Sequence, residues 1–446
     1  MRPLQSLAAA PLQGVVPVPG DKSISHRALL LAALAVGDTT IAGLLAGEDV
    51  QRTAAALRQL GVGVVESAPG VWRVEGVGIG GLAEPDAVLD LGNSGTGVRL
   101  LAGVLATHPF ASFLTGDASL CRRPMGRVVA PLMQMGANFV CRSGERLPMA
   151  VVGARAALPI AYTLPVASAQ VKSAILLAGL NAPGRTTVVE PQPTRDHTER
   201  LLRHFGATLR VSDMPDGRRV IELDGQPELV ARDVTVPADP SSAAFLAVAA
   251  LLVPGSHVTL EGIGANPLRT GLYTTLQEMG AALEWRNLRE ACGEPVADLL
   301  IRASLLVGVE VPAARAPSMI DEYPILAVAA AAAKGVTVLN GLAELRVKES
   351  DRLTTIAEGL RLCGVDVEVG RDRLVVHGCG GRPRGGGTVS TRLDHRIAMA
   401  FLVLGMVSER PVRVDDASPI ETSFPGFVAL INRIGGRLTE DDGKEA

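Results

Sequence analysis

The sequence repeats one local pattern six times over its 446 residues, and this repetition most limits the folds open to it. In each copy an amphipathic stretch ends at a glycine, and a short stretch of strand-forming residues follows. These glycines lie 75, 70, 74, 84 and 71 residues apart, at Gly61, Gly136, Gly206, Gly280, Gly364 and Gly435. Each suits the position just after a helix, where the chain turns into the left-handed conformation. The pattern predicts six units that each contain helices and strands.

A second pattern alternates with the first and predicts a buried helix in every unit. Stretches rich in Ala, Leu, Val and Ile lead into a turn and a β-branched strand, and they span residues 26–44, 97–116, 171–190, 243–262, 323–342 and 397–416. Because these helices are apolar on nearly every side, we expect them inside the fold. Buried helices packed on mixed sheets indicate an α/β or α+β class and a repeat architecture. The pattern leaves open how the six units group.

Charge and cysteine spacing argue against several kinds of partner. The formal net charge is -3, which does not suit a nucleic-acid coat or a polybasic membrane tether. No apolar run approaches the ~18 residues of a membrane span, and the first residues are too weakly apolar for a signal peptide. The five cysteines are dispersed without metal-binding spacing, as free thiols are in a reducing compartment. We expect a cytoplasmic protein with no nucleic-acid or membrane partner.

Polar segments directly precede the six apolar helices and are the candidate site. They are GDKSISHR (20–27), GNSGTG (92–97), ASAQ (167–170), DPSS (239–242), SMIDEY (318–323) and LDHR (393–396). Helix capping is a sufficient explanation for Ser241 and Ser242. It does not explain Lys22, Arg27 or Arg396, because a cation at a helix N-terminus opposes the helix dipole. A bound phosphate or carboxylate would relieve that conflict, so the segments predict an anion site.

Eight segments occur in one order that resembles a known family. They are GDKSISHR, GNSGTG, the RPM of CRRPMGR, ASAQVKSAILLAGL, TRDHTE, MIDEYPILAVAAA, LRVKESDRL and LDHRIAMAFL. They resemble the 5-enolpyruvylshikimate-3-phosphate synthases, or 3-phosphoshikimate 1-carboxyvinyltransferases, from about Gly14 to Phe427. SAQVKSA and SMIDEYP are similar to the class II bacterial subgroup.

The resemblance implies an α/β (α+β) fold of two domains, each an inside-out barrel of three repeated units with buried central helices. An upper domain at 21–236 would bind mainly shikimate 3-phosphate. A lower domain, 1–20 and 237–446, would supply acid and base groups and phosphoenolpyruvate ligands. The chain would cross between the domains twice.

The implied reaction transfers the enolpyruvyl group of phosphoenolpyruvate to the 5-hydroxyl of shikimate 3-phosphate. It is an addition–elimination through a tetrahedral intermediate that releases phosphate. The step belongs to the shikimate pathway, which leads to chorismate and the aromatic amino acids, and it is the target of glyphosate. The resemblance implies no cofactor, no metal and a monomer.

Site residues carry over by their place in the matching segments. The implied shikimate 3-phosphate ligands are Lys22, Ser23, Arg27, Ser168, Ala169, Gln170, Arg195, Asp321 and Lys348. The implied phosphoenolpyruvate ligands are Lys22, Gly95, Arg123, Gln170, Glu349, Arg352 and Arg396. The implied catalytic residues are Asp321, Glu349 and Lys22: Asp321 would accept or orient the 5-hydroxyl proton, Glu349 would deliver a proton to C3, and Lys22 would lie between the substrates.

Two alternatives stay open on the sequence. The first is the enolpyruvyl transferase that acts on UDP-N-acetylglucosamine, which carries a loop cysteine ahead of its arginine; here Cys121 lies only two residues before Arg123. The second is a non-catalytic anion-binding repeat protein. The tail from Thr439 is expected to be disordered.

Overall fold

The computed structural model describes residues 1–440, and the chain divides into two compact units. Unit 1 contains Met1–Pro19, Ala238–Arg289 and the residues from Pro295 onward, and unit 2 contains Gly20–Pro237 and Glu290–Glu294. The segment Glu290–Glu294, which the sequence analysis places in the lower domain, groups with unit 2. The chain therefore passes from one unit to the other four times, where two crossings were expected.

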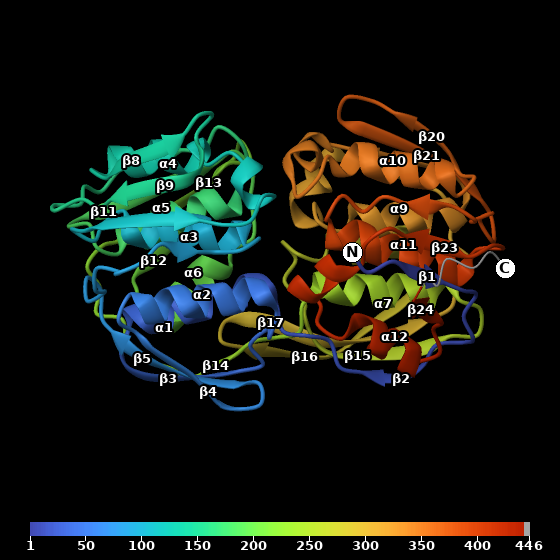
Figure 1. The fold of residues 1–446 in the computed structure, drawn as a ribbon, viewed down its shortest axis with the longest axis horizontal. Helices are drawn as coiled ribbons and strands as arrows, with labels where there is room; N and C mark the ends of the chain where they lie inside the picture. The colour runs from blue at the N-terminus through green and yellow to red at the C-terminus, as the bar shows by residue number, and fades with distance from the viewer. Residues whose placement is uncertain (441–446) are drawn as a thin grey trace. The chain divides into compact units, whose positions relative to one another are not determined.

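Unit 2 contains three buried helices and three four-stranded sheets (Figure 1, blue to green). The buried helices are α1 (Lys22–Leu34), α3 (Gly95–Leu105) and α5 (Ala169–Gly179), and the outer helices are α2 (Glu48–Gln59), α4 (Gly126–Gln134) and α6 (His197–His204). One sheet is β14 (Val234–Thr235), β3 (Val36–Ala42), β5 (Val71–Val77) and β4 (Gly63–Ala68). The second is β6 (Leu89–Asp90), β7 (Ala111–Thr115), β9 (Arg146–Val152) and β8 (Asn138–Arg142). The third is β10 (Ala161–Thr163), β11 (Arg185–Glu190), β13 (Arg219–Asp224) and β12 (Leu209–Asp213).

Unit 1 repeats this plan. Its buried helices are α7 (Pro240–Leu252), α9 (Tyr323–Ala332) and α11 (His395–Val407), and its outer helices are α8 (Gly271–Glu278), α10 (Arg352–Leu362) and α12 (Phe427–Arg433). One sheet is β2 (Gln13–Val16), β15 (His257–Gly264), β17 (Glu294–Arg302) and β16 (Ala282–Ala291). The second is β18 (Glu310–Val311), β19 (Lys334–Asn340), β21 (Arg373–Cys379) and β20 (Asp366–Val369). The third is β22 (Thr388–Val389), β23 (Val412–Val414), β1 (Leu4–Ser6) and β24 (Leu438–Glu440).

The sheets share one topology, which confirms the predicted repeats. In each, a short edge strand runs parallel to the strand that follows the buried helix, and that strand pairs antiparallel with the next, as β6, β7 and β9 do. Strands from distant parts of the chain complete three of the sheets: β14 pairs with β3, β2 pairs with β15, and β1 pairs with β23 and β24. Within residues 1–440, the three sheets of each unit stay separate and do not join into a closed barrel.

The buried helices make up most of each core, as their all-round apolar sequences predict. In α7 and α11 nearly every residue is buried, and the cores contain few aromatic rings because Ala, Leu, Val and Ile fill them. The six repeat glycines all have positive φ, between 76° and 122°. That confirms their placement after a helix, where a side chain would strain the backbone.

The capping prediction for Ser241 and Ser242 is wrong. Asp239 is the N-cap of α7 and accepts from the Ser241 amide, while both serines lie inside the helix. Pro240 at the first helical position leaves the preceding aspartate to fill the cap. The Ser241 hydroxyl instead donates to the Glu322 carboxylate in the buried interior.

Three further expectations can be compared with the described residues. The five cysteines are all free thiols, as predicted. In residues 1–440, no helix combines the length and the apolar character needed to cross a bilayer. The disordered tail was placed too early, because Thr439 and Glu440 belong to β24 and pair with β1. Residues 441–446, the remainder of that tail, lie outside the described residues.

Candidate active site

Five of the predicted site residues form one charged network in unit 1. Asp321 precedes α9, Lys348 and Glu349 precede α10, Arg352 begins α10, and Arg396 lies in the first turn of α11. Both Lys348 Nζ and Arg352 Nη1 lie 3.2 Å from Asp321 Oδ1. Arg396 Nη1 donates to the Asp321 carbonyl oxygen at 3.3 Å. Because the three helices begin side by side, segments far apart in sequence gather around one aspartate.

Arg352 is the most enclosed cation of this network. Its side chain is fully buried, and its guanidinium contacts Asp394 at 2.8 Å, Asp321 at 3.2 Å and Glu349 at 2.5 Å. Burial works against its charge, but Asp394, Glu349 and Asp321 outweigh burial and hold its pKa above the ordinary value. Arg352 is therefore charged, and its direction is fixed by three carboxylates.

Asp394 has two roles, and its ion pair with Arg352 was not predicted from the sequence. It is the N-cap of α11, where it accepts from the Arg396 amide at 3.0 Å, and it holds Arg352 from the other side. Its position directly before His395 and Arg396 was visible in the LDHR segment. What the sequence could not show is that Arg352, 42 residues earlier, folds against it.

Unit 2 places Gly95, Gln170 and Arg123 around the start of α3. Arg99 Nη1 donates to the Gly95 carbonyl and to Gln170 Oε1, both at 3.1 Å. Arg123 Nη2 donates to Asn93 Oδ1 at 2.5 Å. A Cβ atom on Gly95 would lie 2.8 Å from Arg123 Nη1 and 3.0 Å from Arg99 Nη1, so the two guanidinium groups flank this glycine closely. Arg99 and Asn93 were not predicted.

Helix α1 carries Lys22, Ser23 and Arg27. Lys22 Nζ pairs with Asp49 Oδ2 of α2 at 3.0 Å. His26, between Lys22 and Arg27 in the sequence, is buried. Its ring nitrogens lie 2.8 Å from Thr53 Oγ1 and 3.3 Å from Ser94 Oγ, the N-cap oxygen of α3. Burial, with Lys22 and Arg27 adding to it, holds the His26 pKa well below the ordinary value. His26 is therefore neutral and ties α1 to the α3 cap.

The other predicted residues of unit 2 lie at the starts of α5 and α6. Ser168 is the N-cap of α5 and accepts from the Val171 amide at 3.4 Å, and Ala169 and Gln170 form the first turn. Arg195 lies half-buried in the loop between β11 and α6. Arg27 reaches both regions, because its guanidinium donates to Ser173 Oγ of α5 and to Thr198 Oγ1 of α6.

One group in the described chain has the composition of a metal site. The ligand atoms of Asp196, His197 and Glu294 lie within 4.8 Å of one another. Arg200 Nε, however, lies 2.9 Å from Asp196 Oδ1 and 3.8 Å from Glu294 Oε2. This guanidinium supplies the positive charge that a metal ion would bring, so the group is better described as an ion-pair cluster.

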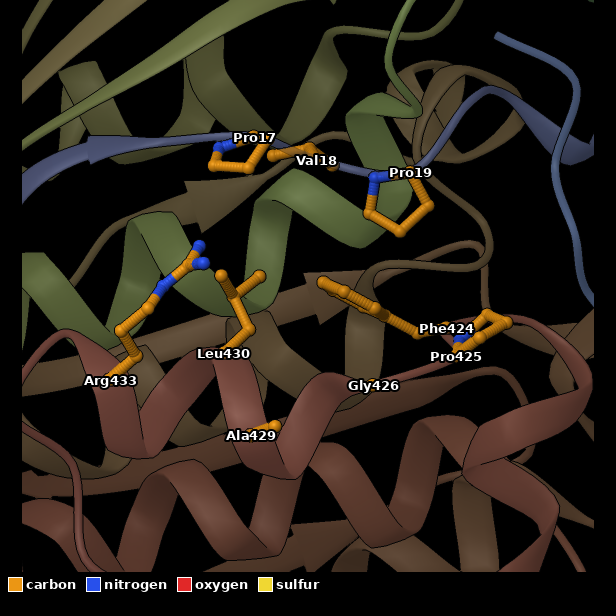
Figure 2. Close-up of a pocket in the computed structure, with 9 residues that line it drawn as sticks. All are labelled: Pro17, Val18, Pro19, Phe424, Pro425, Gly426, Ala429, Leu430 and Arg433. Atoms are coloured by element: carbon orange, nitrogen blue, oxygen red, sulfur yellow. The ribbon is translucent and has the colours of Figure 1, made fainter. Parts of the chain in front are cut away.

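A cavity in unit 1 does not involve the predicted site residues. It has a volume of about 440 Å³ and lies between the segment Pro17–Pro19 and α12 with the residues just before that helix (Figure 2). Its lining is apolar except for Arg433: Pro17, Val18, Pro19, Phe424, Pro425, Gly426, Ala429 and Leu430. A cavity of this composition offers little to hold a phosphorylated substrate.

Comparison with known proteins agrees with the resemblance seen in the motifs. A family model described as EPSP synthase (3-phosphoshikimate 1-carboxyvinyltransferase) matches residues 8–431. The 3-phosphoshikimate 1-carboxyvinyltransferase of Paramagnetospirillum magneticum is 62% identical over 441 residues, which cover 99% of each chain. That of Granulibacter bethesdensis is 65% identical and aligns over 94% of this chain and 93% of its own.

Solved structures agree in fold. EPSP synthase from Acinetobacter baumannii is 43% identical, with a TM-score of 0.87, over 99% of this chain and 100% of its own. The enolpyruvyl transferase NikO from Streptomyces tendae has a TM-score of 0.77 over 99% of each chain, and at 18% identity it supports the fold alone. These matches confirm the predicted α/β fold class and the family.

Proposed function

The chain belongs to the EPSP synthase family, and from that premise we propose that it transfers the enolpyruvyl group of phosphoenolpyruvate to the 5-hydroxyl of shikimate 3-phosphate. The 5-hydroxyl loses its proton and its oxygen bonds to C2 of phosphoenolpyruvate, while C3 gains a proton. The tetrahedral ketal then loses a proton from C3 and its phosphate group, which restores the carbon–carbon double bond. The product is the enolpyruvyl ether and inorganic phosphate.

The observation that carries this proposal is the network around Asp321. A substrate pair with several negative charges requires cations that are already held in place, and Lys348, Arg352 and Arg396 all contact Asp321. Preorganised charges of this kind cost no rearrangement at the moment of reaction. The same network contains two carboxylates, Asp321 and Glu349, which can exchange the protons that addition and elimination require.

The residue roles are part of the proposal. Asp321 accepts or orients the 5-hydroxyl proton, Glu349 exchanges the proton at C3, and Lys22 lies between the substrates. The shikimate 3-phosphate ligands are Lys22, Ser23, Arg27, Ser168, Ala169, Gln170, Arg195, Asp321 and Lys348. The phosphoenolpyruvate ligands are Lys22, Gly95, Arg123, Gln170, Glu349, Arg352 and Arg396. Arginine suits the phosphate and carboxylate of these substrates because its planar fork binds both in a bidentate manner.

The two alternatives from the sequence have less support. Relatives at 57–65% identity over nearly the whole chain are named for the shikimate reaction, not for UDP-N-acetylglucosamine. An anion-binding protein without activity has no need for Asp321 and Glu349 among its cations.

We further propose a monomer in the cytoplasm, where free cysteines stay reduced. Light scattering of the purified chain tests the monomer: a mass near 46.3 kDa supports it, and a multiple of that mass contradicts it.

Phosphate release tests the function. The purified chain is incubated with phosphoenolpyruvate and shikimate 3-phosphate together, and with each alone. Release that needs both substrates supports the proposal. Release from phosphoenolpyruvate alone, or none with both present, contradicts it.

A further inference from the structure

A buried ion triad in unit 2 lies directly behind the predicted phosphate ligands. Lys172 of α5 has a fully buried side chain, and its ammonium lies 3.0 Å from Glu190 Oε2 and 2.7 Å from Glu199 Oε1. Both carboxylate side chains are also buried, at 0% and 2% exposure. Glu190 ends β11, and Glu199 lies in the first turn of α6. One ammonium therefore joins three separate elements.

The triad fixes both segments that carry predicted phosphate ligands. On one side, Lys172 is one turn after Ser168, and its amide donates to the Ser168 carbonyl oxygen at 3.1 Å. On the other side, the Lys172 ammonium donates to the Thr194 carbonyl oxygen at 3.4 Å, directly before Arg195. Thr194 also donates its hydroxyl to Glu190, which closes the loop that carries Arg195.

A second set of contacts joins the same two helices. Ser173, next to Lys172, lies 2.7 Å from Thr198 Oγ1 across the gap between α5 and α6. Arg27 donates to both hydroxyl oxygens. The side chains that surround the predicted phosphate position are thus held by a hydrogen-bonded layer beneath them.

Stability alone does not account for this triad. Removing three charged groups from water is costly, and apolar replacements of similar volume are often as stable or more so. Two carboxylates also face a single ammonium, which leaves them incompletely compensated; burial, reinforced by Glu190 and Asp196, raises the pKa of Glu199 despite Lys172. The triad joins the α5 helix to the loop that carries Arg195, because the Lys172 ammonium contacts Glu190, Glu199 and the Thr194 carbonyl oxygen.

We propose that Lys172 is a positioning residue for the acceptor phosphate. By binding Glu190 and Glu199, it fixes the position of Arg195 relative to Ser168. The inference rests on the proposed function. It predicts an effect specific to the phosphate group of the acceptor. The affinity for shikimate 3-phosphate should depend strongly on Lys172. The affinity for shikimate, which lacks the phosphate, and the KM for phosphoenolpyruvate should not.

The test compares Lys172→Met with wild type. Isothermal titration gives the Kd for shikimate 3-phosphate and for shikimate, and steady-state phosphate release gives the KM for phosphoenolpyruvate. We expect the Kd for shikimate 3-phosphate to rise about 10- to 100-fold, as a displacement near 1 Å would cause, with the other two constants changed by less than about threefold. Glu199→Gln keeps an oxygen acceptor for Lys172 and should stay close to wild type, whereas Glu199→Leu should resemble Lys172→Met.

A stability-matched control separates positioning from general loosening. Leu223→Ala, at a buried position of β13 in the same core, removes apolar packing and leaves the three charged groups of the triad in place. If Leu223→Ala raises the Kd for shikimate 3-phosphate as much as Lys172→Met does at equal loss of stability, the inference is overturned. It is overturned equally if shikimate and shikimate 3-phosphate weaken together. If Lys172→Met does not fold, Glu199→Leu is compared with Glu199→Gln by the same two Kd values. The inference then requires that only Glu199→Leu weakens the binding of shikimate 3-phosphate. A wild-type chain that does not bind shikimate 3-phosphate would instead refute the proposed function.

Discussion

Two cationic side chains contact the Asp321 carboxylate, and a third donates to its backbone carbonyl oxygen. The geometry of Asp321 is therefore defined before any substrate binds. Lys348 and Arg352 share one oxygen of its carboxylate, and Arg396 binds its carbonyl. A group fixed in this way can meet a hydroxyl without first rearranging. The residue scale is therefore where the proposed chemistry is most directly testable.

Replacing Asp321 with Asn keeps the shape of the side chain and removes its capacity to accept a proton. We expect kcat to fall about 100- to 10,000-fold, the usual contribution of a general acid or base. The measurement is phosphate release at saturating substrates. Asp366→Asn, at an exposed position at the start of β20, is the matched control and should leave kcat unchanged. A kcat for Asp321→Asn within threefold of wild type would remove Asp321 from the mechanism.

Replacing Gly95 with Ala tests how closely the anion site is built. The new methyl group would meet Arg123 and Arg99, and Arg123 is held by Asn93, so a guanidinium must move or the ligand must. We expect glyphosate inhibition to weaken about 10- to 200-fold, the range for one methyl group in a fitted pocket. Gly381→Ala, where a Cβ meets nothing within 4 Å, should not change inhibition. Unchanged inhibition of Gly95→Ala would refute this account of the site.

The elements show which parts of the fold were predictable. Repeat glycines and apolar helices were predictable because both depend on neighbouring residues: a left-handed turn needs glycine, and an apolar helix needs burial. Asp394 was not recognised as a partner of Arg352, and Asp49 was not recognised as a partner of Lys22, because those contacts form only when separate helices pack. The capping error at Ser241 arose because Pro240, directly before it, takes the first helical position and leaves the cap to Asp239.

Gly280 tests the repeat glycines at the element scale. It follows α8 with φ near 92°, and a Cβ there would have room, with Leu305 O the nearest atom at 3.7 Å. Any cost of Gly280→Ala therefore comes from backbone conformation, about 1–2 kcal/mol in the free energy of unfolding. Urea denaturation measures it, with Gly381→Ala as the unstrained comparison. Equal stability of the two variants would show that the left-handed turn does not require glycine.

Glu199 gives the fold a pH dependence of known sign. Its pKa is raised in the folded state above the ordinary value of 4.5, so the folded chain keeps a proton that the unfolded chain has released. The free energy of unfolding therefore falls as pH rises from about 4.5 to the raised pKa, at no more than about 1.4 kcal/mol per pH unit. Glu199→Gln removes this loss, so its stability relative to wild type should increase with pH over that window. Urea denaturation across the window checks this, and a constant difference would contradict it.

At the scale of the whole molecule, the motif order predicted the family and the fold class, which the comparisons confirm. Five of the predicted lower-domain site residues form one network in unit 1, and their catalytic and binding roles stay predictions. The segment Glu290–Glu294 was unpredictable, because it is the tip of the β16–β17 hairpin: most of the hairpin belongs to unit 1, while the tip groups with unit 2. A hairpin turn has no sequence pattern that says which core it joins.

The most direct test of the account is the choice of acceptor for phosphoenolpyruvate. Phosphate release is measured with shikimate 3-phosphate, with UDP-N-acetylglucosamine and with no acceptor, at one enzyme concentration. We expect phosphate release only when shikimate 3-phosphate is the acceptor. Release with UDP-N-acetylglucosamine, or no release with any acceptor, would contradict it.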